Sequence, residues 1–220
     1  MNAKFDLVIF DCDGVLVDSE PIALDLLRRT LEETGLDLPI ETVRQTFQGR
    51  SMAGVVAAAN VGFGHVVEIE RLWRMQGVLL EELTERLRPI AGMAGLLGAL
   101  DAKRCVASSS NTKRLRHSLA TVGFLEAFGS AVFSADEVAS GKPAPDLFLH
   151  AAKTMGVPPS RCVVVEDSPV GIEAGLAAGM RTIGFTGGGH AVGQSYRQRL
   201  VAAGASEIAV SASELDSMLR

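Results

Sequence analysis

The sequence has few cysteines, no long apolar run and no excess of positive charge. No apolar stretch reaches the ~18 residues of a transmembrane helix. The N-terminal residues MNAKFDL contain no apolar core of a signal peptide. We therefore expect a cytoplasmic protein. The cysteines are odd in number and lie in or beside apolar runs, which favours free buried thiols over a disulfide at Cys12, Cys105 and Cys162.

The net charge of -5 argues against a nucleic-acid partner, because such partners require a basic surface. A negatively charged substrate would need a metal ion or a local cluster of cations. The four histidines are scattered along the chain and form no Cys/His spacing typical of a zinc site. With 220 residues, the chain has room for one large domain or two modest ones.

Short apolar runs alternate with helical patterns through most of the chain, which predicts an α/β fold with a parallel sheet and right-handed crossovers. The expected strands are residues 6–10, 103–108, 130–134, 161–166 and 180–185. The expected helices are residues 111–123, 145–156 and 168–180. After about residue 191 we expect a helix, a short strand at EIAV and a last helix.

The segment from about residue 20 to 88 breaks this alternation, because it contains no convincing strand. Its helical patterns cover residues 20–35, 38–47, 51–59 and 66–87. We therefore expect an all-helical domain, residues 16–89, inserted into an α/β domain formed by residues 1–15 and 90–220. No exposed heptad pattern is evident, so we expect a monomer or a weak homodimer.

Polar residues follow four of the expected strands. They are Asp11 and Asp13; Ser108, Ser109, Ser110 and Asn111; Lys142; and Glu166, Asp167 and Ser168. Ligands of open parallel sheets bind beyond the carboxyl ends of the strands, so these groups should converge at one edge. Crowded carboxylates repel one another and need a cation, and oxygen ligands suit Mg²⁺. Hydroxyl and N–H groups at a helix start bind phosphate, and a lysine stabilises developing negative charge.

The sequence around these residues resembles the four ordered motifs of the haloacid dehalogenase superfamily of hydrolases. The matching stretches are DCDGVLVDSE, VASSSN, GKPAPD and VVVEDSPVGIEAGLAAGM. The resemblance implies a Rossmann-like parallel-sheet core. The insert is similar to the small helical cap of the β-phosphoglucomutase-like branch. Within that branch, the chain looks like bacterial sugar-phosphate phosphatases such as 6-phosphogluconate phosphatase.

The resemblance implies a Mg²⁺-dependent phosphatase that acts on a small phosphorylated metabolite, such as a sugar phosphate. Asp11 would be the nucleophile that forms an aspartyl-phosphate, and Asp13 the general acid and base. The implied metal ligands are Asp11, the backbone carbonyl of Asp13, and Asp167, with Glu166 around the metal or in contact with it. The implied phosphate-binding residues are Ser108 and Lys142, helped by Ser109 and Asn111.

The stretch FQGRS in the insert suggests a substrate contact. Gly49 separates two expected helices, and loops of this kind in related caps face the active site. We hypothesise that Arg50 contacts the substrate beyond its phosphate, together with Gln48. The alternative is that Arg50 is a surface arginine.

Structural roles fit several neighbouring residues better than catalytic ones. Cys12 should point away from the two aspartates that flank it, as alternate residues of a strand do. Asp18 is expected to fix a loop, and Ser110 to cap a helix. His190 is expected to be exposed in a glycine-rich flexible loop.

Three other functions remain as alternatives. A β-phosphoglucomutase-type phosphomutase has a histidine in the first cap helix, where this chain has Ala23. Dehalogenases and phosphonatases generally lack the second aspartate, which is present here as Asp13. A non-catalytic protein of the same fold would have lost a motif residue, whereas all the core motif residues are present.

Overall fold

The computed structural model describes residues 4–48, 52–191 and 193–220, which form two compact units. One unit contains residues 1–18 and 88–220, and the other contains residues 19–87. The boundaries between the units therefore lie at 18–19 and 87–88, close to the boundaries at 15–16 and 89–90 expected from the sequence. The reason is a short pairing inside the first unit: Asp18 N–H donates to the Arg88 carbonyl, and Ile90 N–H donates to the Leu16 carbonyl.

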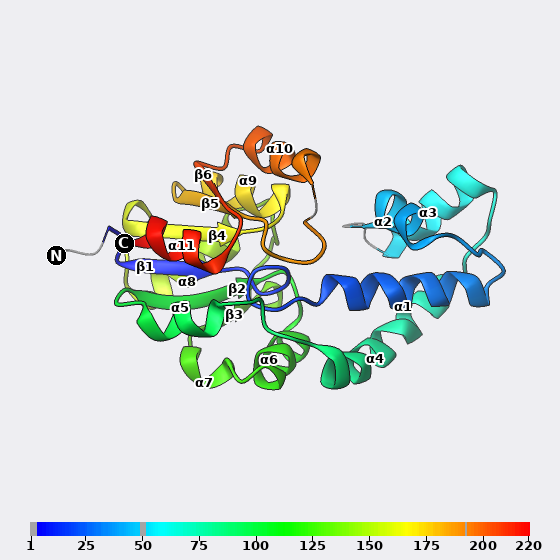
Figure 1. Ribbon diagram of the computed structural model, residues 1–220, viewed down its shortest axis with the longest axis horizontal. Helices are drawn as coiled ribbons and strands as arrows, with labels where there is room; N and C mark the ends of the chain where they lie inside the picture. Colours follow the sequence, from blue (N-terminus) through cyan, green and yellow to red (C-terminus); the bar gives the residue numbers. More distant parts are fainter. Residues whose placement is uncertain (1–3, 49–51, 192) are drawn as a thin grey trace. The chain divides into compact units, whose positions relative to one another are not determined.

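The first unit is built on a six-stranded parallel sheet with the strand order β3-β2-β1-β4-β5-β6 (Figure 1). The strands are β1 Leu7–Phe10, β2 Lys103–Ser108, β3 Val132–Ser134, β4 Cys162–Glu166, β5 Arg181–Phe185 and β6 Glu207–Ala209. All five pairings between neighbouring strands are parallel, so the predicted α/β fold with a parallel sheet is confirmed. Chain order reverses at β1, and in sheets of this kind ligands bind beside such a point.

Seven α-helices accompany the sheet within the described residues. They are α5 Met93–Ala99, α6 Thr112–Thr121, α7 Leu125–Phe128, α8 Asp146–Met155, α9 Pro169–Ala177, α10 Gln194–Ala202 and α11 Ala212–Leu219. Two single 3₁₀ turns lie at Ala135–Glu137 and Pro159–Arg161. The sequence missed α5, which is rich in glycine, and α7, which is a single turn. No described helix combines the length and the hydropathy of a membrane span.

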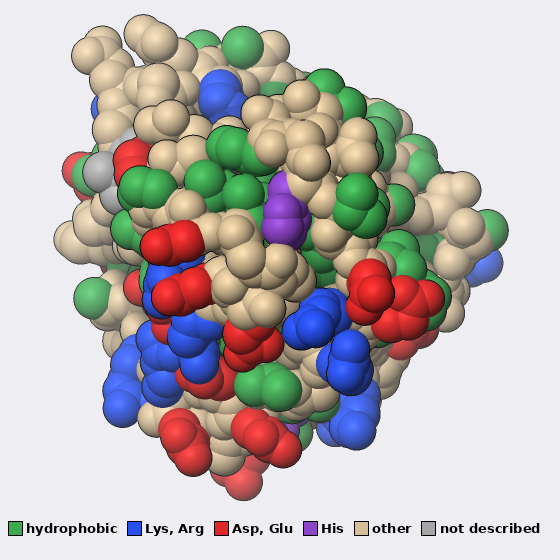
Figure 2. Space-filling model, turned by 90° about the vertical axis from the view of Figure 1, so that its right-hand side faces the viewer, with side chains coloured by type: hydrophobic (Ala, Val, Ile, Leu, Met, Phe, Trp, Pro, Cys, Tyr) green, Lys and Arg blue, Asp and Glu red, His purple; other side chains and the backbone are tan. Residues whose placement is uncertain are grey.

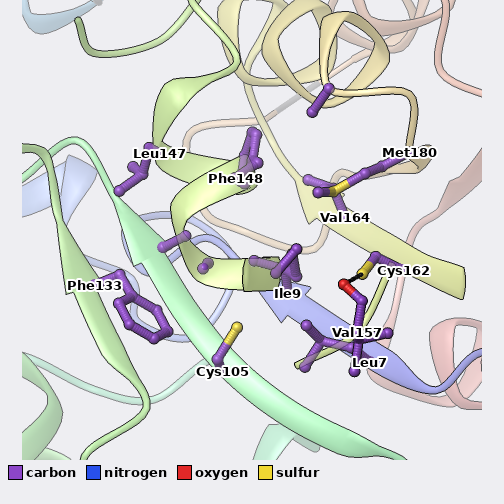
Figure 3. Packing of buried hydrophobic residues seen from close by; sticks show 14 of the residues in the cluster. Leu7, Ile9, Cys105, Phe133, Leu147, Phe148, Val157, Cys162, Val164 and Met180 are labelled. Atoms are coloured by element: carbon purple, nitrogen blue, oxygen red, sulfur yellow. Dashed lines mark hydrogen bonds between the residues drawn. The ribbon is translucent and has the colours of Figure 1, made fainter. Parts of the chain in front are cut away.

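Apolar side chains pack on both faces of the central strand. Figure 3 shows Leu147 and Phe148 of α8 over Ile9, in a buried cluster that also contains Cys105 and Val164. The next residue of β1, Phe10, contacts Phe128 of α7 edge-on, with ring centroids 6.3 Å apart. Because both faces are covered, β1 is an uninterrupted apolar run rather than an alternating one. The end of β1 is thereby fixed from two sides.

The second unit is all-helical within its described residues, as the sequence predicts. Its helices are α1 Glu20–Glu33, α2 Ile40–Phe47, α3 Met52–Phe63 and α4 Ile69–Arg86. Helices α1 and α4 are linked by ion pairs from Arg29 to Glu82 at 2.6 Å and from Arg86 to Asp25 at 3.1 Å. Leu31, Val43 and Leu72 lie in the apolar core of this unit, and all three are buried. On the face shown in Figure 2, acidic and basic side chains are interspersed.

We expect Gly175→Ala to destabilise the protein and Gly98→Ala to stabilise it. A Cβ at Gly175 in α9 would lie 2.7 Å from the Thr182 methyl carbon and 3.4 Å from the Val164 Cβ. Overpacking of this kind costs about 1–3 kcal/mol. Gly98 is an exposed position in α5 with no atom within 4 Å of the added Cβ, and the substitution there should gain about 0.4–1 kcal/mol. Urea denaturation of the two variants measures both effects, and equal shifts would contradict this packing of α9.

Candidate active site

Parallel pairing of β1 with β4 brings three carboxylates together at the ends of these strands. Phe10 is paired with Val165, and Asp11 N–H donates to the Val165 carbonyl at 2.9 Å. Asp11 therefore leaves its strand beside Glu166 and Asp167. Each of the three residues offers an oxygen within 4.8 Å of the others, and the exposed fractions are only 7%, 1% and 6%. The convergence expected from the sequence occurs for these three side chains.

Lys142 lies at the centre of this cluster, from the segment that leads into α8. Its Nζ donates to Asp11 Oδ1 at 2.7 Å, to Glu166 Oε1 at 2.5 Å and to the Ala107 carbonyl at 3.0 Å. These bonds use all three hydrogens of an ammonium group. The Lys142 side chain is 2% exposed, so the cation compensates the acids within the protein rather than at its surface.

The pKa values show that one lysine cannot neutralise the whole cluster. Burial opposes the charge on Lys142, but Asp11 and Glu166 together raise its pKa above the ordinary value. Burial also raises the pKa of Asp11; Lys142 lowers it, and the carboxylates of Glu166, Asp167 and Asp13 raise it further. The net pKa of Asp11 is well above its usual range. A second cation would therefore stabilise the ionised form of Asp11.

The donor set fits a divalent cation with a preference for oxygen, such as Mg²⁺. Both carboxylate oxygens of Glu166 already accept hydrogen bonds. Oε1 accepts from Lys142, while Oε2 accepts from the Ser168 N–H at 3.0 Å and from the Ser168 hydroxyl at 2.8 Å. A direct metal bond from Glu166 would compete with these contacts. Asp11 and Asp167 are therefore the better candidates for direct side-chain ligands, with Glu166 orienting the cluster.

The turn after β2 differs from the expectation at one residue, Ser110. Ser108 is buried and its Oγ accepts from the Ser110 N–H at 3.1 Å, whereas Ser109 is exposed. The predicted helix cap at Ser110 is wrong: Asn111 caps α6, because its Oδ1 accepts from the Arg114 N–H at 2.9 Å. The helix begins at Thr112, which leaves Ser110 one position too early to act as the cap.

Asp13 is held by two donors from this same region. Ser110 Oγ donates to Asp13 Oδ2 at 2.7 Å, and Arg114 Nη2 donates to Asp13 Oδ1 at 3.0 Å. Gly14 follows with a φ of +80°, a conformation that glycine adopts without strain. A Cβ at Gly14 would lie 2.0 Å from Asp167 Oδ2, so glycine also makes room for the acid. Arg114 was not among the candidate residues of the sequence, because nothing in the basic stretch KRLR, residues 113–116, indicates which residue turns inward.

His190 is the second residue that the sequence missed, and its predicted exposed position is wrong. It is 4% exposed, and its Nε2 lies 2.7 Å from Asp167 Oδ2. Its ring meets Tyr196 edge-on at 5.4 Å. The preceding glycines permit this approach, because a Cβ at Gly188 would lie 2.8 Å from the Gly14 carbonyl oxygen. The glycine run was the available signal, but glycine runs occur equally in exposed loops.

The remaining candidates have varied outcomes. Asp18 fixes a loop as expected, because its Oδ1 accepts from the Gly189 N–H at 2.9 Å. Arg50 lies outside the described residues, so its predicted substrate contact stays a prediction. Gln48 directly follows α2, and its N–H donates to the Arg44 carbonyl at 3.2 Å.

The three cysteines are free and buried, as the sequence predicts. Burial is the main cause that raises the pKa of each thiol, and the neighbouring charges of Asp13 and Asp11 raise that of Cys12 further. The pKa of Cys162 rises to about 11. A raised pKa lowers the fraction of the nucleophilic thiolate, so Cys12 is a structural residue between the two aspartates.

We expect no cysteine of the native protein to react with Ellman's reagent at pH 8. A thiol with a pKa of about 11 is only ~0.1% ionised at that pH, and burial excludes the reagent as well. All three thiols should react once guanidinium chloride unfolds the chain. Ser213→Cys, at an exposed position of α11, supplies a fast-reacting control. Rapid modification of any native thiol, located by peptide mapping, would contradict the buried placement of that cysteine.

Comparison with known proteins gives a consistent set of matches. A sequence model of the haloacid dehalogenase-like hydrolases matches residues 5–179. The 6-phosphogluconate phosphatase of Escherichia coli is 32% identical over 191 residues, which cover 86% of each chain. The resemblance seen in the motifs is thus confirmed over most of the chain.

Two solved structures extend the similarity to three dimensions. A conserved haloacid dehalogenase-like protein of unknown function from Agrobacterium tumefaciens is 38% identical, with a TM-score of 0.91 and 97% of each chain covered. A hydrolase of the same family from Deinococcus radiodurans, with bound phosphate and sodium, is 34% identical, with a TM-score of 0.85. The match covers 99% of this chain and 96% of that protein. Both the α/β unit and the helical unit are therefore shared with these relatives.

Proposed function

The chain belongs to the haloacid dehalogenase-like hydrolases and is a phosphatase, and we propose that it hydrolyses a small sugar phosphate in a Mg²⁺-dependent reaction through an aspartyl-phosphate on Asp11. One observation carries this proposal. Lys142 joins Asp11 to Glu166 in a buried cluster that also contains Asp167, at the carboxyl ends of β1 and β4. This is the arrangement expected of a carboxylate nucleophile that works beside a cation.

In the first step, a carboxylate oxygen of Asp11 attacks the phosphorus and the ester oxygen departs. Hydrogen bonding to Lys142 Nζ holds the Asp11 carboxylate in place at the end of β1. Ser108 would contact the phosphoryl oxygens, with Ser109 and Asn111 at the neighbouring turn, and Lys142 would do so by exchanging one of its three hydrogen bonds for one to the substrate. A bound Mg²⁺, held by Asp11, Asp167 and the backbone carbonyl of Asp13, would neutralise charge on the phosphoryl group.

In the second step, water attacks the aspartyl-phosphate and releases Asp11. Protonated Asp13 gives its proton to the departing ester oxygen in the first step, and the carboxylate that results takes one from the attacking water in the second. The proton balance therefore closes over one turnover. General acid–base catalysis of this kind typically raises the rate by ~10²–10⁴-fold. The buried position of Asp11 excludes most bulk water from the nucleophile before substrate arrives.

The substrate class is proposed from the comparison with known proteins. The name of the E. coli relative identifies a phosphorylated sugar acid as its substrate, and we extend this to a sugar phosphate for the present chain. Arg50 and Gln48 of the helical unit are proposed to contact the substrate beyond its phosphate. We also propose that the enzyme is cytoplasmic and acts as a monomer or a weak homodimer.

The direct test is release of inorganic phosphate from a panel of sugar and sugar-acid phosphates, with Mg²⁺ or with EDTA. We expect turnover of one or a few members with Mg²⁺ and none with EDTA. Asp11→Asn should lower kcat by at least about three orders of magnitude, because the nucleophile is lost. Asp6→Asn is the matched control at the opposite end of β1, where Asp6 pairs with exposed Arg161. It should leave kcat within about twofold of the wild type.

Two results would refute the proposal. Phosphate release that EDTA does not reduce would exclude the metal, and full activity of Asp11→Asn would exclude the covalent step. Isomerisation of glucose 1-phosphate with a bisphosphate primer, in place of net phosphate release, would identify a phosphomutase instead.

A further inference from the structure

We propose that Arg114 is a positioning residue for Asp13: together with Ser110, it fixes both oxygens of the Asp13 carboxylate in the direction needed for proton transfer. The inference rests on the proposed phosphatase reaction and adds to it a residue outside the four motifs. It concerns only the α/β unit, since β1, the turn after β2 and α6 all belong to it.

The Asp13 carboxylate has a separate donor on each oxygen. Arg114 Nη2 lies 3.0 Å from Oδ1, and Ser110 Oγ lies 2.7 Å from Oδ2. A single hydrogen bond would leave the carboxyl plane free to rotate, whereas two bonds from different directions fix both its plane and its direction. The side chains of Arg114 and Asp13 are 26% and 19% exposed, so the pair is partly shielded from water. A shielded ion pair retains more of its strength than one on an open surface.

Arg114 is itself well anchored. Its backbone N–H donates to Asn111 Oδ1 at 2.9 Å, which places Arg114 in the first turn of α6. Leu115, the next residue, is buried and holds that turn against the unit. The guanidinium therefore reaches Asp13 from a fixed position on α6. The helix cap at Asn111 fixes that position, and so helps to orient the Asp13 carboxylate.

The two aspartates of the first motif depend on different cations. Asp11 is bonded to Lys142, which is 2% exposed, and Asp13 is bonded to Arg114 on another element. Each acid can therefore be held without displacing the cation of the other. Asp13 needs this support because it follows β1 on a chain that turns away at Gly14. A donor or acceptor in proton transfer must lie within about 2.6–3.2 Å of its partner, and a 1 Å misplacement can cost about 10²-fold in rate.

Loss of Arg114 should therefore matter most when the departing group needs a proton. An alkoxide that leaves a sugar phosphate requires protonation by Asp13 as the P–O bond breaks. A 4-nitrophenolate leaves from 4-nitrophenyl phosphate without that proton. The value of kcat/KM reports the steps up to the first phosphoryl transfer, so comparing the two substrates isolates this function from hydrolysis of the aspartyl-phosphate.

The experiment compares wild type, Arg114→Ala, Arg114→Lys and Arg116→Ala. Arg116 is an exposed arginine of the same helix and serves as the matched control. For a sugar phosphate that the enzyme turns over, we expect Arg114→Ala to lower kcat/KM by about 10- to 100-fold, a part of the full value of acid–base help. For 4-nitrophenyl phosphate we expect a decrease of less than about threefold. Arg114→Lys should restore part of the loss, and Arg116→Ala should match the wild type.

Ser110→Ala is a second test, because it removes the hydrogen bond to the other Asp13 oxygen, Oδ2. It should show the same selective loss on the sugar phosphate, and circular dichroism confirms that each variant is folded. An equal decrease on both substrates would overturn the inference, since it would indicate a purely structural role. No decrease on either substrate would overturn it as well. A wild-type protein without phosphatase activity would instead refute the proposed function on which the inference rests.

Discussion

The bond network of Lys142 is the interaction on which the rest of the site depends. Asp11, Glu166 and Asp167 are buried within reach of one another at the ends of two paired strands. Charges removed from water are costly, and like charges at short distance add to that cost. The ammonium group of Lys142 offsets part of it through bonds to Asp11 and Glu166. Without this lysine, the sheet edge that presents Asp11 would carry uncompensated buried acids.

The same arrangement is the basis for proposing a second cation at the site. The pKa of Asp11 stays well above its ordinary range despite Lys142, because burial and the neighbouring carboxylates outweigh the lysine. A metal at Asp11 and Asp167 would favour the ionised form of Asp11, and Arg114 is bonded to Asp13 separately. Positive charge is thus distributed over distinct elements, so that Asp11 and Asp13, the proposed nucleophile and proton donor, lie two residues apart but are bonded to different cations.

Much of this could be predicted from the sequence, because the fold repeats one pattern and the chemistry sits at the strand ends. Apolar runs followed by polar residues located β1, β2 and β4 and the acids behind them. The sequence could not locate Arg114 or His190, whose roles depend on which way a helix face or a loop turns. The error at Ser110 has the same origin. The helix begins one residue later than expected, so Asn111 caps it, and the Ser110 hydroxyl donates to Asp13 instead. The predicted contact of Arg50 lies outside the described residues.

The most direct measurement is a double-mutant cycle on Lys142→Met and Glu166→Gln, with unfolding free energies determined in EDTA. If Lys142 compensates the buried acids, Lys142→Met should cost about 3–5 kcal/mol, because it leaves Asp11 and Glu166 without their cation. Glu166→Gln should cost less, because Lys142 keeps its ion pair with Asp11. The double variant should then be more stable than the sum of the single effects implies, by at least about 1 kcal/mol. Additive effects would contradict the central role of this lysine and would indicate that Lys142 and Glu166 act independently.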